Sequence, residues 1–502
     1  MKKVLNMKKI LRYFLVFTAL AVILTACGKD WLDVNKNPDQ PEKVPAKSVF
    51  PAAVMSIGYV AGYNFNLIGG FWSQYWTQSN SANQYKSLDS YTLTNSDYNA
   101  GWSEMYSGGL NDMKYVVNAA ETAKDWNYFL MGTVMQCYAY QMLVDLYGTI
   151  PYTDALKGDD ASQNTQPKFD AADAIYDNLI VKLDAALAKD FTALTCTNPG
   201  TSDYLFGGNI TNWKKLANTL KLKIYMRQMY VRPTVAQAGV QKLYTDGALF
   251  LTSDAQITQF VDETGKDNPF YNLNVRTINV ATNLRASTTM FKYLVTNGDP
   301  RRAKFYDSKV NSLPQGGYNL PNTGVTTTTG ISVFIQTATD PLVFFSAAES
   351  YFLQAEAVAK GWGTGNDQTL YNSGVAASFT KSGSTAAVAA TFTGTTGIYA
   401  YPTAGTFEQK QEAIIVQKWI SMAGSQGIEA FFETNRTHYP AISTIAATNA
   451  LYTGGKLTYS LEGTAGGTFP KRMLIPNVER TRNANTPAEI SLFTKVWWDV
   501  KP

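Results

Sequence analysis

The sequence between residues 71 and 102 interleaves aromatic rings with amide side chains. Such a mixture suits a neutral sugar polymer, because aromatic faces stack on the C–H faces of pyranose rings and amides hydrogen-bond to hydroxyls. We therefore predict a carbohydrate-binding surface, with candidate residues Trp72, Trp76, Asn83, Tyr85 and Trp102 and, further along the chain, Tyr271. A second interpretation stays open, since Trp72 and Trp76 lie at helical spacing and would equally suit the buried face of a helix.

Catalytic chemistry has little support in the sequence. The only histidine, His438, excludes a three-histidine metal site, an HExxH zinc site and a histidine pair for proton relay. A Ser-His-Asp triad would depend on His438, and the chain has no Gly-x-Ser-x-Gly turn. A helical glycoside hydrolase needs two carboxylates about 5–10 Å apart. The 39 acidic residues leave such a pair open, but none lies in a recognisable hydrolase motif. We expect no enzymatic activity, no cofactor and no metal ion.

The charge distribution argues against nucleic acid as a partner. The whole chain has a net charge of +4, but residues 1–26 contain five basic residues and no acid. Taking these five from +4 leaves −1 for the remainder, which offers no basic surface to a phosphate backbone. Arg227 and Arg436 lie in helical stretches, where an arginine usually pairs with a carboxylate. We interpret them in this way rather than as ligand-binding cations.

The first 27 residues are organised like a bacterial lipoprotein signal peptide followed by its cysteine. Basic residues up to Arg12 precede an apolar stretch from Tyr13 to Leu24, too short for a comfortable membrane span of about 20 residues. The stretch ends in Leu24-Thr25-Ala26-Cys27, which resembles a bacterial lipobox. The resemblance implies cleavage before Cys27 and lipidation of its sulfur, so that several acyl chains anchor the mature protein. An ordinary signal peptide with an incidental cysteine is the alternative.

The remainder of the chain is predicted to be mainly helical. Residues 28–48 contain three prolines, which exclude a regular helix and predict an extended linker. Small residues opposite bulky aromatics in successive helical stretches favour tetratricopeptide-like helix pairs. One strong helix is expected to begin at Asp340-Pro341, with the aspartate as its cap, and to end at Gly361. Residues 246–339 and 381–406 have weak periodicity and predict inserts of loops and short strands.

Short segments spread over almost the whole mature chain carry a family resemblance. In chain order they are Asp30-Trp31-Leu32-Asp33-Val34-Asn35-Lys36-Asn37-Pro38, Phe71-Trp72-Ser73-Gln74-Tyr75-Trp76, Asp145-Leu146-Tyr147-Gly148-Thr149-Ile150-Pro151-Tyr152, Asn212-Trp213-Lys214-Lys215-Leu216, Ser346-Ala347-Ala348-Glu349, Gln417-Lys418-Trp419-Ile420, Asn435-Arg436-Thr437-His438-Tyr439-Pro440 and Pro470-Lys471-Arg472-Met473-Leu474-Ile475-Pro476. Together they resemble the SusD/RagB-like outer-membrane lipoproteins, and most of all the subgroup SusD-like family 2. His438 and Asn435 depart from the family pattern, in which glycine and arginine are usual.

The resemblance implies a mainly α fold, in which a tetratricopeptide-like helix-pair scaffold bears loop and short-strand inserts that carry the ligand site. It implies a signal peptide (1–26), a lipid-anchored linker (27–48) and one helical domain (49–502). It further implies a lipid-anchored, surface-exposed protein of the outer membrane that delivers glycans, or in some members peptides, to a SusC-like TonB-dependent transporter. A scaffold that only closes the transporter, with no ligand of its own, is a third class beside the binding protein and the hydrolase.

Overall fold

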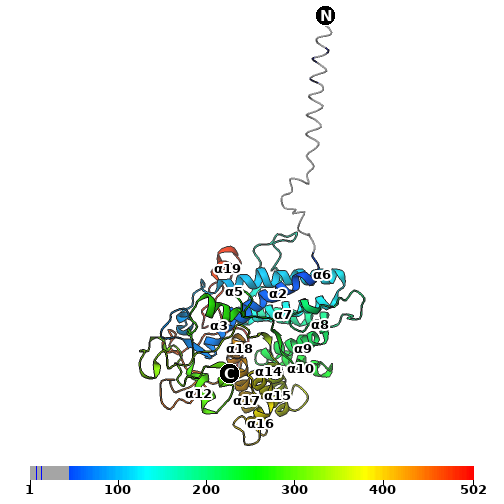
Figure 1. The fold of residues 1–502 in the computed structure, drawn as a ribbon. Coiled ribbons are helices and arrows are strands. Elements are labelled where there is room, and N and C mark those ends of the chain that lie inside the picture. Colours follow the sequence, from blue (N-terminus) through cyan, green and yellow to red (C-terminus); the bar gives the residue numbers. More distant parts are fainter. Residues whose placement is uncertain (1–6, 8, 10–12, 14–43) are drawn as a thin grey trace. The chain divides into compact units, whose positions relative to one another are not determined.

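The computed structural model describes residues 44–502 and, before them, residues 7, 9 and 13. The predicted signal peptide, apart from these three residues, and Cys27 with most of the linker therefore lie outside the described residues. Residues Ala46–Pro502 form one unit (Figure 1). Helices account for 50% of the residues and strands for 6%, which confirms the prediction of a mainly helical fold with short strands. In the described part, no helix is both long enough and apolar enough to span a membrane.

The N-terminal half of this unit is built almost entirely from helices. They are α2 (Ala46–Tyr59), η2 (Val60–Phe65), α3 (Asn66–Trp72), α4 (Lys86–Ser90), α5 (Asn99–Glu104), η3 (Met105–Leu110), α6 (Asn111–Ala123), α7 (Trp126–Tyr147), α8 (Ala172–Leu187), η4 (Gly200–Ser202), α9 (Ile210–Arg227) and α10 (Pro233–Thr245). The segments η2 and η3 are π-helical turns, and η2 joins α2 and α3 without a break in helical backbone.

The C-terminal half combines further helices with three of the six named strands. Its helices are α11 (Pro269–Tyr271), η5 (Asn272–Thr277), α12 (Thr288–Thr296), α13 (Arg302–Phe305), η6 (Gly317–Asn319), η7 (Gly324–Thr326), α14 (Ala347–Ala359), α15 (Asp367–Lys381), α16 (Ala386–Thr393), α17 (Phe407–Met422), α18 (Gly427–Thr437) and α19 (Asn477–Arg482). The strands form three antiparallel two-stranded sheets, which are β1 (Trp76–Gln78) with β5 (Leu284–Ala286), β2 (Ile150–Pro151) with β3 (Phe169–Asp170), and β4 (Ala255–Ile257) with β6 (Leu342–Phe345).

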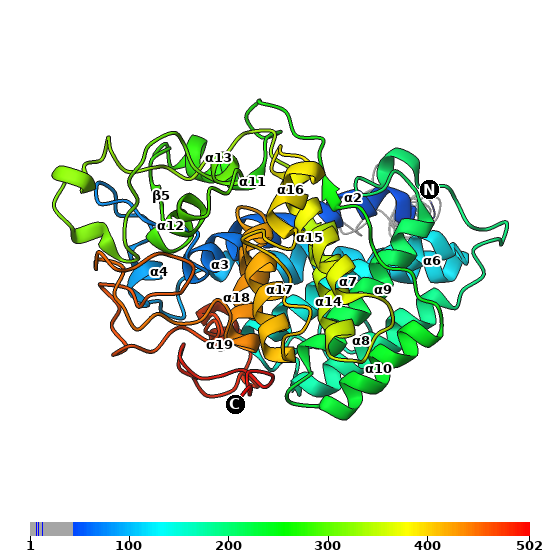
Figure 2. The same ribbon diagram turned by 90° about the horizontal axis from the view of Figure 1, so that it is seen from below.

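Successive helices pack in pairs, namely α6 with α7, α9 with α10, α14 with α15 and α17 with α18. Helix α3 packs against α18 and thereby joins the start of the unit to its C-terminal part. In Figure 2, α14, α15 and α17 lie between α8–α10 on one side and the elements α11–α13 and β5 on the other. The inserted residues 246–339 thus lie beside the N-terminal helix α3, to which β5 is tied through β1.

In two of these helix pairs, a small residue on one helix leaves room for an aromatic ring of the other, as the sequence suggested. A Cβ atom added to Gly374 on α15 would lie 2.7 Å from the ring of Phe352 on α14. One added to Gly239 on α10 would lie 2.2 Å from the ring of Tyr225 on α9. Because protein cores are packed to near-crystalline density, these glycines set the distance between the paired helices.

The start of the helix expected at Asp340-Pro341 was predicted incorrectly. The apolar run that follows these residues forms strand β6, which pairs with β4, and helix α14 begins only at Ala347. Ser346 provides the cap, because its Oγ accepts a hydrogen bond from the backbone N–H of Glu349 at 3.2 Å. The aspartate instead pairs with Lys304 at 2.9 Å, which places it beside a pocket described below.

A buried group of charged side chains, here called the ion cluster, lies between α7, α9, α14, α17 and α18. It contains the carboxylates Asp145, Glu349, Glu356, Glu429 and Glu433 and the cations Lys223, Arg227, Lys418 and Arg436. The Nε atom of Arg227 lies 3.0 Å from Oδ2 of Asp145, and its two other nitrogens pair with Glu429 and Glu433. The interpretation of Arg227 and Arg436 as partners of carboxylates is therefore confirmed.

Candidate ligand-binding surface

Four of the aromatic residues predicted to stack on a ligand lie in the core. Trp72, Trp76, Tyr85 and Trp102 keep 3%, 0%, 5% and 3% of their surface exposed. A ring that stacks on a sugar needs a free face, so this burial contradicts the expectation that these four rings form the platform itself. The helical spacing of Trp72 and Trp76 therefore reflects the second interpretation, in which they face the interior.

Each buried ring has a structural role. Trp72 packs on Phe431 at a centroid distance of 4.9 Å and donates a hydrogen bond to the carbonyl of Leu88. Trp102 lies edge to face with Tyr147 at 4.9 Å, and its Nε1 donates to Oε2 of Glu479 at 3.3 Å. The edge of Trp102 borders a shallow groove between η3, the loop 155–167 and α19.

Asn83 and Tyr271 are the two sequence candidates that remain accessible. Asn83 is exposed, and its backbone N–H donates to Oε1 of Gln84 at 3.1 Å. Tyr271, at the end of α11, is half-buried, with the guanidinium of Arg276 5.3 Å from its ring centre. Their ligand-binding roles stay predictions.

Other tyrosines around η2 provide the partly exposed rings that the buried residues do not. Tyr59 and Tyr63 lie edge to face at 5.5 Å, and Tyr59 is 39% exposed. Tyr98 is half-buried at the start of α5, and both α5 and α11 pack on η2. We call the surface formed by Tyr59, Tyr63, Tyr98 and Tyr271 the tyrosine face.

The backbone of the tyrosine face departs from regular geometry in two ways. Both η2 and η5 are π-helical, and π-turns occur often at functional sites. Tyr98 has a φ of 57°, a left-handed conformation that is costly for a bulky residue and that clusters at binding sites. Beneath the surface, the hydroxyl of Tyr85 donates to Oδ1 of Asn274 at 2.5 Å and so links α4 to η5.

The hydroxyls of Tyr63 and Tyr98 stay protonated at neutral pH. Burial raises the pKa of Tyr63, and the neighbouring Tyr59 adds to the effect. Burial is also the main cause that raises the pKa of Tyr98, followed by Tyr85 and Tyr63. Protonated hydroxyls both donate and accept hydrogen bonds, as sugar hydroxyls require.

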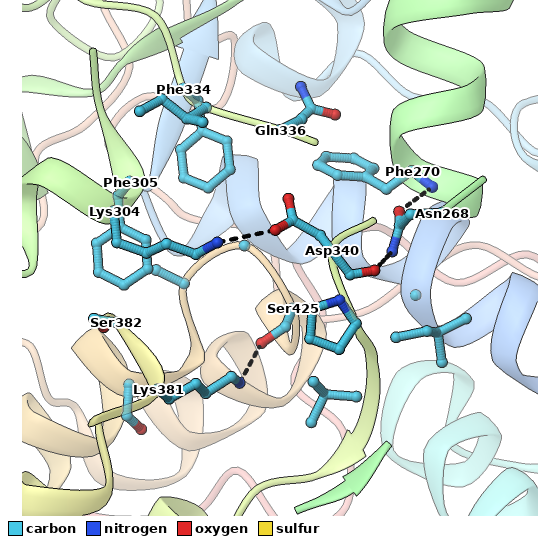
Figure 3. Close-up of a pocket in the computed structure, with 18 residues that line it drawn as sticks. Asn268, Phe270, Lys304, Phe305, Phe334, Gln336, Asp340, Lys381, Ser382 and Ser425 are labelled. Atoms are coloured by element: carbon cyan, nitrogen blue, oxygen red, sulfur yellow. Dashed lines mark hydrogen bonds and ion pairs between the residues drawn. The ribbon is translucent and has the colours of Figure 1, made fainter. Parts of the chain in front are cut away.

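A pocket opens beside the tyrosine face, because Gly62 of η2 and Phe270 of α11 form part of its wall (Figure 3). Its cavity volume is about 90 Å³. Phe270, Phe305 and Phe334 form most of its apolar lining. Trp76 lies directly behind them, with centroid distances of 5.3 Å to Phe270 and 4.7 Å to Phe334. The buried tryptophan thus supports the pocket wall without reaching the cavity.

Charged and polar groups also line the pocket, and some of them lie beside the phenylalanine rings (Figure 3). Figure 3 shows Lys304 directed at Asp340 and Lys381 directed at Ser425, with Nζ to Oγ 3.0 Å in the second pair. Asp340 is the one carboxylate among the lining residues, and it pairs with Lys304. Glycoside hydrolysis needs two carboxyl groups, so the lining of this pocket does not supply that pair. Within the described residues, no group of three or more His, Cys, Asp or Glu side chains is placed to hold a metal ion.

A surface of tyrosines on a helix-pair scaffold, beside a small pocket that is lined partly by the insert 246–339, suits a ligand-binding protein. The family model SusD-like family 2, described as starch-binding and associating with the outer membrane, matches residues 38–459. The chain belongs to this family, whose members are binding proteins without catalytic activity. It is therefore a SusD-like nutrient-binding protein of the outer membrane.

Solved structures agree with this fold. A chitin-binding SusD homolog from Flavobacterium johnsoniae is 20% identical, with a TM-score of 0.71 over 90% of this chain and 99% of its own. A SusD homolog from Bacteroides uniformis is 21% identical, with a TM-score of 0.69 over 90% and 99%. A SusD homolog from Bacteroides ovatus is 23% identical, with a TM-score of 0.66 over 91% and 99%. No curated protein sequence matches the chain.

Proposed function

We propose that this protein captures glycans on the tyrosine face and delivers them to a SusC-like TonB-dependent transporter. The observation that carries the proposal is the presence of four partly exposed tyrosines at the end of α2, in η2, and at α5 and α11, which both pack on η2. Amide side chains occur in the segments that follow and precede these rings, namely Asn83, Gln84, Asn99, Asn272 and Asn279. The chitin-binding homolog from Flavobacterium johnsoniae supports a glycan as the ligand.

Removing two rings of the tyrosine face should weaken glycan binding. For the double variant Tyr59→Ala/Tyr271→Ala we expect about tenfold lower affinity, since each aromatic contact contributes about 0.5–1.5 kcal/mol. The melting temperature should change little, because both rings are partly exposed. Isothermal titration calorimetry with a panel of oligosaccharides measures the affinity. Tyr351→Ala, a half-buried tyrosine on α14, is the matched control. Unchanged affinity in the double variant would remove the tyrosine face from the proposal.

We further propose that Cys27 carries the lipid anchor that holds the protein at the outer membrane surface. Several acyl chains at about 0.8 kcal/mol per buried CH₂ give durable attachment. The variant Cys27→Ala should appear in the soluble fraction and incorporate no labelled palmitate, whereas the wild type should appear labelled in the membrane fraction. Palmitate labelling that persists in Cys27→Ala would refute this anchor. Cys196→Ala, which changes a partly exposed cysteine, is the control.

A further inference from the structure

The pocket beside the tyrosine face holds one more cation than it holds carboxylates. Lys304 and Lys381 line it, but Asp340 is the one acid, and it pairs with Lys304. Lys381 donates to the hydroxyl of Ser425, and no carboxylate of the described residues lies within 4.0 Å of its ammonium group. Lys381 is therefore the lysine of this pocket that has no directly paired carboxylate among the described residues.

The surroundings of Lys381 favour a negatively charged ligand. Burial is the main cause that lowers the pKa of Lys381, and Lys304 adds to the effect, whereas Asp254, Glu349 and Asp340 oppose it. A cation in such a site is stabilised when a carboxylate arrives, because the low local dielectric strengthens the attraction. Lys381 lies at the end of α15 and Ser425 in the turn between α17 and α18, so the packed helices fix the position of the charge.

The volume of the pocket and its uncharged lining residues determine the size and polarity of a ligand that it can bind. A cavity volume of about 90 Å³ equals the space of about six to nine waters at about 10–15 Å³ each. That is room for one sugar ring but not for a chain. The phenylalanine rings are largely buried and contribute only their edges to the lining, while the side chains of Gln336, Ser382 and Ser421 add hydrogen-bonding groups.

We propose that this pocket binds a carboxylate-bearing sugar residue, a uronic acid, of a glycan that extends over the tyrosine face. The inference rests on the proposed glycan-binding function and deepens it. The carboxylate pairs with the ammonium of Lys381, and the hydroxyls of the ring lie against the polar side chains of Gln336 and Ser382. The hydroxyl and amide side chains of the rim favour a hydroxyl-rich ligand over the C-terminal carboxylate of a peptide, which would leave them without partners.

The test compares one oligosaccharide with and without its charge. Trigalacturonate and its methyl ester are titrated calorimetrically into wild-type protein, Lys381→Met and Lys381→Gln. The wild type should bind the acid about tenfold more tightly than the ester, as expected for a charge-assisted contact, and both variants should lose this preference. Lys242→Met, which removes an exposed lysine paired with Asp246 on α10, should keep it. Thermal melts show whether each variant is folded.

Equal affinities for acid and ester in the wild type, or a preference that persists in both Lys381 variants, would overturn the assignment of the pocket. So would binding of the peptide Gly-Gly-Leu, but not of its C-terminal amide, in a Lys381-dependent manner. Glycan capture itself would stand if the ester and neutral oligosaccharides still bound and the Tyr59→Ala/Tyr271→Ala variant still lost that binding. Absence of any sugar binding to the wild type would instead reject the proposed function.

Discussion

Replacing Arg227 by methionine is expected to destabilise the protein by about 3–5 kcal/mol, the usual cost of breaking a buried ion pair from one side. The guanidinium is 1% exposed and pairs with Asp145, Glu429 and Glu433. Burial alone would lower the pKa of Arg227, but these carboxylates raise it well above its usual range. Methionine fills a similar volume but leaves Asp145 without its cation, while Glu429 keeps Lys223 and Glu433 keeps Lys418 and Arg436, so the loss is electrostatic.

The pH dependence of this loss has a definite sign. Burial works to raise the pKa of Glu433, yet Arg436, Lys418 and Arg227 hold it well below its usual range, so its contribution to stability is lost as the pH falls. The difference in the free energy of unfolding between the wild type and Arg227→Met should therefore become smaller at acidic pH. Urea denaturation at several pH values measures it. Arg232→Met breaks a more exposed pair with Asp177 and should cost about 1 kcal/mol or less. A similar cost for both variants would contradict the role given to the ion cluster.

Replacing Trp76 by alanine should lower the free energy of unfolding by about 3–5 kcal/mol, as is typical for a buried tryptophan. The ring is fully buried between Phe270 and Phe334, and a Cβ added to Gly70 would lie 1.9 Å from it. Trp76→Phe should retain more of the stability, because it keeps an aromatic ring in contact with the pocket wall. Chemical denaturation followed by circular dichroism distinguishes the two variants.

Measuring both the stability and the oligosaccharide affinity of Trp76→Ala distinguishes a core ring from a ligand-binding ring. Asn83→Ala, at an exposed position in the same stretch of sequence, should leave the stability unchanged within about 0.5 kcal/mol. If Trp76→Ala kept its melting temperature and lost affinity for oligosaccharides, Trp76 would contact the ligand directly. The description of Trp76 as support behind the pocket would then be wrong.

Helices with strong periodicity were predicted well because their burial pattern is local. Apolar residues recur at helical spacing over residues 407–422, which form α17, and over residues 368–379, which lie within α15. The start of α14 was misplaced because a buried strand and a buried helix look alike over four apolar residues, Leu342–Phe345. Only the pairing of β6 with β4, about 85 residues earlier in the chain, distinguishes them.

The candidate site was predicted less well than the fold, for two physical reasons. Ring type and spacing do not reveal which face of a helix is exposed, so buried Trp72 and Trp76 looked like a platform. Tyr59 and Tyr63 were missed, although their spacing of four residues beside Gly58 and Gly62 gave a weak signal. The pocket could not be predicted at all, since Gly62, Lys304 and Lys381 meet only in the folded chain.

The central claim is that the protein binds glycans and releases them uncut. Calorimetric titration of the wild type with neutral and acidic oligosaccharides, followed by chromatography of the recovered sugar, tests it most directly. The account predicts saturable binding and recovery of every oligosaccharide at its original length. Shortened sugar products, or binding of peptides with no binding of any sugar, would contradict it.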